Sequence, residues 1–378
     1  MSDLMHQKTT YKKLEEKYYG FVVPSVELKV GGSALPQDIA NSVVSVSLEL
    51  SCATAQMNVL SFTLSGLYNY EKAAFDMAVI DKYFKLGNNV EVAMGYIKTE
   101  SLFKGYIYET SYTLDINEGL TLAVTCKDFK GIIANKQGDA KRKGSTRIGE
   151  IKNILNYAGY KKYAKLDSAK YLTQLETEYK KKDPNKIMEE HDPLSTELEK
   201  VQELANDYGY EFFILYDAIY FRPSFTKGSN IMAISPDKGL LGADVSYSIG
   251  EMLSAVEVRG YEEDELVTIS GTAKKSIPAK VTTNSDALGY KVIYDEKVTG
   301  ASDAKEKAKA LLENSKWQNS EIKVRTIGLP DIVPGRTIKI EGLSKNIDKN
   351  VYIEQVSHQI STTDGYTTSF TGRIDLYG

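Results

Sequence analysis

The sequence predicts a mainly β protein in which two β-rich regions flank a helical α+β middle segment. Apolar and polar residues alternate over residues 21–135, apolar spacing becomes helical over residues 136–239, and alternation returns over residues 240–378. Short strands between turn residues are typical of a β-barrel or β-sandwich. The predicted division is an N-terminal arm (1–20), a first β-barrel domain (21–135), the helical middle segment (136–239) and a second β-barrel domain (240–378) with an inserted helix near 302–315.

Strand patterns in the first region follow the two-residue period of a half-buried sheet. The clearest is Val43–Leu50, where apolar side chains occupy every second position. Residues 68–82 have helical spacing and predict a helix between strands. The other predicted strands are Ser25–Val30, which Gly31–Gly32 ends, and then Leu60–Leu64, Asn89–Met94, Leu102–Glu109 and Leu120–Cys126.

The middle segment carries the signals of three helices and a β-hairpin. Apolar residues over 148–158 lie on one helical face, and Gly159 is the predicted C-cap of that helix. Thr196 and Glu199 predict a capping box at the start of the third helix, which Gly209 ends. The second helix is predicted over Ser168–Tyr179, and the hairpin over Glu211–Leu215 and Ile219–Arg222.

Turn residues divide the second β-rich region as they divide the first. Asp364–Gly365 falls where a hairpin turn is expected, and Pro334–Gly335 punctuates the first of three C-terminal strands. Residues 301–315 form one amphipathic pattern, for which Ser302 is the predicted cap. Further strands are predicted over Ala243–Ile249 and Leu253–Arg259.

Composition and charge argue against several classes of protein. The 378 residues carry a formal net charge of −4, which does not suit a dedicated nucleic-acid binder. Two cysteines, Cys52 and Cys126, are too few for a disulfide framework and are expected as reduced core residues. The sequence has no run of about 18 apolar residues and no apolar leader. We therefore expect synthesis in the cytoplasm, no membrane-spanning segment and no specific nucleic-acid binding.

No catalytic or metal-binding constellation stands out in the sequence. His6, His191 and His358 lack the paired spacing of a metal site, and Cys52 and Cys126 have no adjacent histidine. We expect His358 to be a packed or hydrogen-bonded strand histidine. Neither a phosphate-binding glycine loop nor a nucleophile elbow occurs. The prediction is a protein without catalytic, cofactor-binding or metal-binding residues and without a cofactor.

A set of landmark residues follows the chain in a defined order. In the first region it comprises Phe84, Gly87, Gly95, Phe103, Gly105 and Asp128, and it continues with Tyr208, Gly209, Pro223, Gly260, Pro334, Gly335, His358 and Gly365. With these residues, the chain from about residue 20 to its end resembles the phage late control D family. It is also similar to the hub half of type VI spike proteins of the valine-glycine-repeat type.

The resemblance implies a structural, non-enzymatic baseplate hub of a contractile tail, as found in phages, tailocins and related injection particles. It implies a homotrimer in which two similar, tube-like β-barrels per chain form a pseudo-sixfold ring. Such a ring joins the hexameric tail tube to the trimeric central spike in the bacterial particle. Tape measure and baseplate wedge proteins are further implied partners. Because the spike relatives continue into a needle and this chain ends at Gly378, we expect the needle to be a separate chain.

Two other functions stay open from the residues alone. A particle-associated cell-wall hydrolase would need a carboxylate pair, and the sequence marks none among its 51 acidic residues. A receptor- or carbohydrate-binding β-protein would need exposed aromatic side chains in a groove, and Trp317 is better explained as a core or interface anchor. For a hub, we expect a channel lined by acidic and polar side chains, because three chains of −4 each carry −12.

Overall fold

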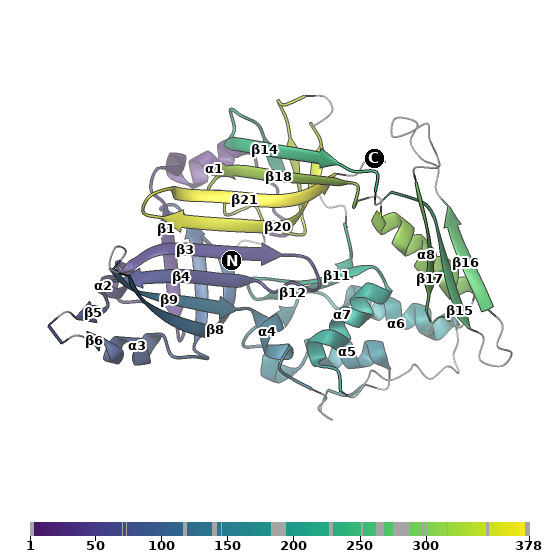
Figure 1. The fold of residues 1–378 in the computed structure, drawn as a ribbon, viewed down its shortest axis with the longest axis horizontal. Coiled ribbons are helices and arrows are strands. Elements are labelled where there is room, and N and C mark those ends of the chain that lie inside the picture. The colour runs from purple at the N-terminus through teal and green to yellow at the C-terminus, as the bar shows by residue number, and fades with distance from the viewer. Residues whose placement is uncertain are drawn as a thin grey trace.

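The computed structural model is a mainly β structure with a few helices (Figure 1). It describes residues 4–69, 71–72, 74–115, 119–137, 142–144, 146–182, 194–226, 230–250, 252–261, 268–274, 288–295, 298, 301–315, 317–344 and 348–374. One large sheet crosses the molecule, and two three-stranded sheets lie beside it. No helix in these described ranges combines the length and the apolar character that crossing a membrane requires.

The large sheet contains strands from both predicted β-rich regions. Its order is β14-β18-β21-β20-β3-β4-β9-β8-β7-β1-β2, and β19 pairs with both β20 and β13. β20 and β3 join the two regions by antiparallel pairing, from Gln355 opposite Ser51 to Ser361 opposite Ser45. The strands are β1 (Ser25–Val30), β2 (Ser33–Ala34), β3 (Val43–Ser51), β4 (Val59–Ser65), β7 (Asn89–Gly95), β8 (Thr99–Asp115), β9 (Gly119–Lys127), β13 (Asn230–Ile234), β14 (Leu240–Tyr247), β18 (Ser320–Ile327), β19 (Thr337–Ile340), β20 (Asn350–Ser361) and β21 (Gly365–Ile374).

The two β-rich regions are joined in one open sheet, where the sequence predicts two barrels. Among the described residues the strand order does not close on itself. Alternation shows which face of a strand is buried, but it does not show which strand lies beside it. A single core accordingly runs under both regions, and it contains Leu48 and Phe62 from one region together with Val356 and Phe370 from the other.

Residues 68–82 differ from the predicted helix. β5 (Tyr68–Asn69) and β6 (Ala74–Phe75) form a short hairpin, and α3 is confined to Met77–Tyr83. The Asp76 side chain caps α3 by accepting a backbone hydrogen bond from its first turn. An N-cap residue has non-helical dihedral angles, so the helix cannot extend back through Asp76.

Helices in the middle of the chain pack against a three-stranded sheet of order β10-β12-β11. The predicted capping box is confirmed, because the Thr196 amide donates to the Glu199 carboxylate at 2.6 Å and the Thr196 hydroxyl accepts from the Glu199 amide. Gly159 is not a C-cap, because Asn156 already ends the helix. The elements are α4 (Phe129–Ile133), α5 (Arg147–Leu155), η2 (Ala158–Tyr160), β10 (Lys165–Leu166), α6 (Lys170–Lys182), α7 (Glu197–Asp207), β11 (Tyr210–Leu215) and β12 (Ala218–Pro223).

A second small unit interrupts the C-terminal β-rich region. β15 (Leu253–Tyr261), β16 (Thr268–Lys274) and β17 (Gly289–Tyr294) form a sheet that α8 (Ala301–Ser315) covers, at the right of Figure 1. The predicted strand over residues 253–259 therefore lies outside the large sheet. α8 has the predicted span but begins one residue before Ser302, so Ser302 is not its cap. The separate core of this unit consists of Val256, Val258, Val298, Ala304, Ala308 and Leu312.

The N-terminal segment packs into the core of the large sheet. It contains α1 (Tyr11–Lys17), and Tyr18 after it is fully buried. The Lys17 ammonium lies 2.8 Å from the Glu100 carboxylate and 2.9 Å from that of Asp331. Because these acids belong to the first and second β-rich regions, the segment connects both. The remaining short helices are η1 (Tyr19–Phe21) and α2 (Gln37–Ala40).

Candidate functional site

Four strands in each half of the large sheet have the same order. We define the N-terminal unit as β3, β4, β8 and β9, which are ordered β3-β4-β9-β8. The C-terminal unit is β14, β18, β20 and β21, ordered β14-β18-β21-β20. In both units the first strand along the chain is followed in the sheet by the second, the fourth and the third. The same four-stranded unit therefore occurs twice, and Figure 1 shows the two side by side.

The third strand of each unit carries a β-bulge at the same place. The pairing of β8 with β9 skips Tyr108, and the pairing of β20 with β21 skips Glu354. Each strand reaches its hairpin turn seven residues later, at Asp115 and at Ser361 (108 to 115 and 354 to 361). The predicted turn before the last strand is confirmed, because Gly365 pairs directly with Ser361.

Gly87 and Gly335, two predicted landmarks, occupy the same place in the two halves. Their amides donate to the carbonyl oxygens of Ile107 and Ile353, at 2.9 and 2.8 Å. Their φ angles are +86° and +77°, in the left-handed region that favours glycine. Pro334, another landmark, is buried immediately before the second of them. The two glycines therefore make the same tight approach to the third strand of each unit.

Most other landmark residues are packing positions. Phe84 and Phe103 are buried in the large core. A Cβ at Gly105 would lie 2.2 Å from the Lys127 carbonyl oxygen, so a side chain does not fit there. Of the remaining landmarks, Gly95 ends β7, Tyr208 and Gly209 follow α7, Pro223 ends β12, and Gly260 lies in β15 where a Cβ would meet the Val298 carbonyl oxygen.

Asp128 joins the large sheet to the middle of the chain. Its carboxylate accepts hydrogen bonds from the amides of Lys130 at 3.0 Å and Asn58 at 3.2 Å, and it caps α4. The buried Lys130 ammonium donates to three backbone carbonyls, including that of Gln56 at 2.6 Å. Burial raises the pKa of Asp128 to about 6 and lowers that of Lys130 to about 8. Both groups are enclosed and bonded, which suits a structural role.

His358 is a buried and hydrogen-bonded strand histidine, as predicted. Its Nε2 lies 3.1 Å from the Ile332 carbonyl oxygen, and its Nδ1 lies 3.0 Å from the hydroxyls of Thr368 and Tyr366. Burial lowers the pKa of His358 to about 3, so the ring is neutral at neutral pH. With no exposed surface, this ring cannot meet a substrate.

Other chemistry-bearing residues do not gather into a reactive cluster in the described part of the chain. Cys52 and Cys126 are unpaired core residues, as predicted, and burial raises the pKa of both thiols. No group of three or more His, Cys, Asp or Glu residues in that part is placed to hold a metal. His191 lies outside the described residues. Trp317 is a core residue, stacked on Phe225 with 4.9 Å between ring centroids.

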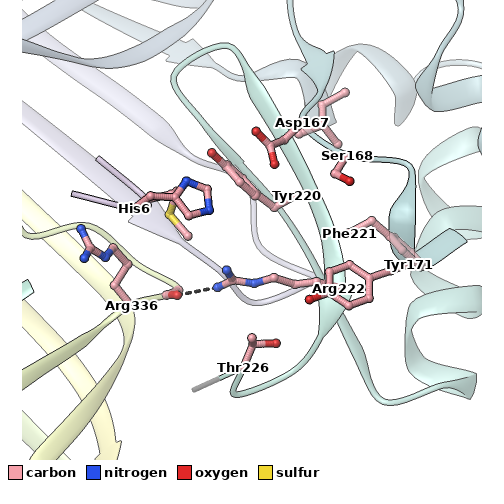
Figure 2. A pocket seen from close by; sticks show the side chains of 12 residues that line it. His6, Asp167, Ser168, Tyr171, Tyr220, Phe221, Arg222, Thr226 and Arg336 are labelled. Atoms are coloured by element: carbon pink, nitrogen blue, oxygen red, sulfur yellow. Dashed lines mark hydrogen bonds between the residues drawn. The ribbon is translucent and has the colours of Figure 1, made fainter. Parts of the chain in front are cut away.

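A pocket of about 260 Å³ lies where the N-terminal segment, the middle sheet and the loop before β19 meet (Figure 2). Arg222, on its wall, pairs with Glu211 at 2.6 Å and donates to the Gly335 carbonyl oxygen. Glu211 also accepts from the Tyr352 hydroxyl at 2.5 Å, and burial raises the pKa of its carboxyl. These bonds connect three distant segments, which makes the pocket wall a structural joint.

One face of the two units is lined by small polar side chains. Along β3, Ser45 and Ser47 alternate with the buried Val46 and Leu48. The same alternation places serine, threonine or glutamine on β4, β8, β9, β20 and β21, away from the core, whereas β18 places Glu321, Lys323 and Arg325 on this face. We call this the hydroxyl face, and it includes Ser45, Ser47, Ser61, Thr63, Ser111, Thr113, Thr121, Thr125, Ser357, Gln359, Thr367, Ser369 and Thr371.

The array of eight strands has an open edge at each end within the described residues. β14 pairs only with β18. β8 pairs with β7 as far as Tyr106, and past that residue no described strand pairs with its outer side. The Phe75 ring of β6 does contact the Tyr112 ring there, with 5.1 Å between centroids. Near these edges Tyr112 is 44% exposed and Tyr247 is 48% exposed. Long edge strands with exposed apolar side chains attract other strands unless something covers them.

The fold is similar to that of phage tail proteins. A tail protein from Neisseria meningitidis superposes with a TM-score of 0.66 at 13% identity, covering 94% of this chain and 97% of that chain. The 43 kDa tail protein of prophage MuSo2 from Shewanella oneidensis superposes with a TM-score of 0.64 at 14% identity, covering 92% and 98%. A Francisella PdpA–VgrG complex gives a TM-score of 0.51 at 8% identity, covering 97% and 61%.

These likenesses concern the fold, because the identities are low. No protein-family model matches the sequence, and no curated protein matches it either. The chain thus shares its architecture with phage tail proteins over nearly its whole length and theirs.

Proposed function

We propose that this protein is the structural hub of a contractile-tail baseplate, a homotrimer that joins the hexameric tail tube to the trimeric central spike. The observation that carries the proposal is the four-stranded unit present twice in one chain. Three chains in a ring supply six similar units, so the ring can match sixfold symmetry on one side and threefold symmetry on the other. The fold shared with tail proteins and with a VgrG complex supports this assignment.

Ring closure gives the two open edges a partner. Head-to-tail contacts between unlike surfaces make a ring when the rotation closes. The opposite face of the sheet carries the core and the N-terminal segment, so the hydroxyl face is the one that lines the channel. Hydroxyl groups offer weak, exchangeable hydrogen bonds, and charged groups of both signs lie among them, with Glu49 and Glu109 on one side and Lys323 and Arg325 on the other. DNA or protein cargo would therefore pass this lining without binding tightly.

The proposed hub is non-enzymatic and has no cofactor. In this proposal the two β-rich regions (21–135 and 240–378) each contribute one four-stranded unit to the tube-like ring, and the arm (1–20) and the helical middle segment (136–239) complete the chain. Its partners are two further copies, the tube and spike proteins, and the tape measure and wedge proteins. Synthesis in the bacterial cytoplasm precedes assembly into the particle.

The oligomeric state of the purified chain tests this proposal. Light scattering should give a mass three times the 42.1 kDa of one chain, and electron microscopy should give threefold rings with a central channel. A chain that stays monomeric even with tube and spike proteins present would contradict the proposal. Incubation with peptidoglycan separates the alternatives, because release of soluble fragments would indicate a hydrolase.

A further inference from the structure

We propose that neighbouring chains pair β8 with β14 in the register that the single chain already uses between β20 and β3. This inference rests on the proposed ring. β20 is the third strand of the C-terminal unit, and β3 is the first strand of the N-terminal unit. The open edges are the remaining third strand, β8, and the remaining first strand, β14. The junction inside the chain is therefore a template for the junction between chains.

The equivalence of β8 and β20 is fixed residue by residue. Both strands have their bulge seven residues before the hairpin, at Tyr108 and Glu354. Four residues after the bulge come Tyr112 and His358, which pair with Leu122 and Thr368 on the fourth strand. The pairing between the second and fourth strands of each unit agrees with this equivalence. In the N-terminal unit Leu64 lies opposite Leu122, and in the C-terminal unit Thr326 lies opposite Thr368.

The equivalence of β3 and β14 follows in the same way. The pairing of β3 with β4 skips Val44, and the pairing of β14 with β18 skips Leu241. Four residues after each bulge come Leu48 and Val245 (44 to 48 and 241 to 245). These two residues are therefore counterparts on the first strand of each unit.

Applying the register of β20 with β3 to their counterparts β8 and β14 gives the register between neighbouring chains. Inside the chain His358 lies opposite Leu48, so Tyr112 should lie opposite Val245 of the neighbouring chain. One position away, Ser357 lies opposite Glu49, so Ser111 should lie opposite Ser246 of the neighbour. The remaining pairs that follow are Thr110 with Tyr247, Thr113 with Asp244, and Glu109 with Ser248.

This register also places side chains of similar character next to each other on both faces of the sheet. Thr110 and Tyr112 would continue the core side together with Val245 and Tyr247, which covers two tyrosines that are 44% and 48% exposed in one chain. Ser111 and Ser246 would continue the hydroxyl face across the junction. A slip by one residue would turn Tyr112 against a channel-side residue, because adjacent side chains point to opposite faces.

The free half of β8 has the length that the template requires. β20 pairs with β19 only as far as Tyr352 and with β3 only beyond its bulge. β8 likewise pairs with β7 up to Tyr106 and is open beyond its bulge. The N-terminal unit thus lacks only the strand that β14 of another chain would supply.

Engineered disulfides measure the register directly. Residues directly opposite in antiparallel strands have Cα atoms about 4.5–5.5 Å apart, within disulfide reach, whereas residues offset by two are about 7–8 Å apart. Ser111→Cys is combined in three variants with Ser246→Cys, Asp244→Cys or Ser248→Cys, which all lie on one face. The native cysteines are buried and do not compete. Each variant is oxidised, and covalent trimer is quantified on a non-reducing gel.

The expected result is covalent trimer mainly from the Ser111→Cys and Ser246→Cys combination, at least tenfold above the two offset combinations. Single-cysteine variants should give none. Strongest linkage in an offset combination would overturn the register while leaving the trimer intact. A trimer by light scattering without linkage in any combination would overturn the edge junction. A chain that stays monomeric by light scattering even with tube and spike proteins present would instead contradict the proposed function.

Discussion

The N-terminal and C-terminal units share strand order and bulge positions, yet their third strands differ in burial. β20 is flanked on both sides past its bulge, and His358 there is fully buried. Its counterpart Tyr112 on β8 is 44% exposed. The first strands differ in the same direction, because Leu48 is fully buried and Val245 is half-buried. The difference shows that a neighbouring strand, rather than the unit itself, completes each core.

The units also differ in what joins their first two strands. In the N-terminal unit a short loop of residues 52–58 leads from β3 to β4. In the C-terminal unit the chain leaves the sheet after β14, builds the β15–β17 and α8 unit, and returns at β18. The strand order survives this insertion, so the loop between the first and second strands is a position where the unit tolerates added structure.

The largest expected difference between the units is in their first strands. Leu48→Ala should lower the free energy of unfolding by about 2–5 kcal/mol, because a buried leucine leaves a cavity. Val245→Ala should cost less than about 1 kcal/mol in the single chain, because its side chain is only partly buried against the core. Urea unfolding at low protein concentration measures both. Equal losses would mean that Val245 is already buried within one chain.

The second comparison concerns the two glycines. Alanine at either position meets backbone strain of about 1–2 kcal/mol at positive φ. At Gly335 a Cβ would also lie 2.7 Å from the Arg222 guanidinium and the Phe213 ring, whereas nothing lies within 4 Å at Gly87. Overpacking adds about 1–3 kcal/mol, so Gly335→Ala should destabilise more than Gly87→Ala in urea unfolding. The reverse order would show that the two turns are not equivalent.

The third comparison is a pH dependence that His358 gives to the C-terminal unit. Burial holds the folded pKa of His358 at about 3, below the usual histidine value of 6.5. The neutral ring therefore makes its full contribution to the free energy of unfolding above about pH 6.5. This contribution is lost as the pH falls, by up to about 1.4 kcal/mol per pH unit. His358→Gln should flatten the dependence of unfolding free energy on pH between pH 6 and 4.

The control for this experiment is His6→Gln, which changes an exposed histidine. Asp128 acts in the opposite direction, because its raised pKa of about 6 makes its contribution fall as the pH rises from 4 to 6. That contribution is present in all variants and cancels in the comparison. An unchanged slope in His358→Gln would mean that the ring is protonated without cost in the folded protein.

The sequence predicted the local structure correctly where interactions between residues close together in the chain determine it. The Thr196 and Glu199 capping box, the helix over residues 301–315 and the turn at Gly365 were all predicted correctly. Residues 68–82 were not, because the N-cap at Asp76 and the short hairpin override the helical spacing there. When short-range signals of similar strength compete, apolar spacing alone does not show which of them decides the local structure.

The candidate site was visible from sequence only in part. The landmark glycines Gly87 and Gly335 were identified as residues, but not as counterparts of each other. The equivalence depends on hydrogen bonds to Ile107 and Ile353, which lie about twenty residues further along the chain. The open edges of β8 and β14 gave no signal at all, because an edge is defined by the absence of a neighbour.

The sequence by itself determined elements such as β3, α7 and α8 together with their buried faces, because side-chain periodicity and capping act over a few residues. Only the tertiary structure decided that both β-rich regions share one sheet and that residues 253–315 leave it. It also decided that, among the described residues, β14 and the part of β8 past Tyr106 each have an open edge. Backbone hydrogen bonds between strands are the same whatever the side chains, so the choice of partner strand depends on how the whole core packs.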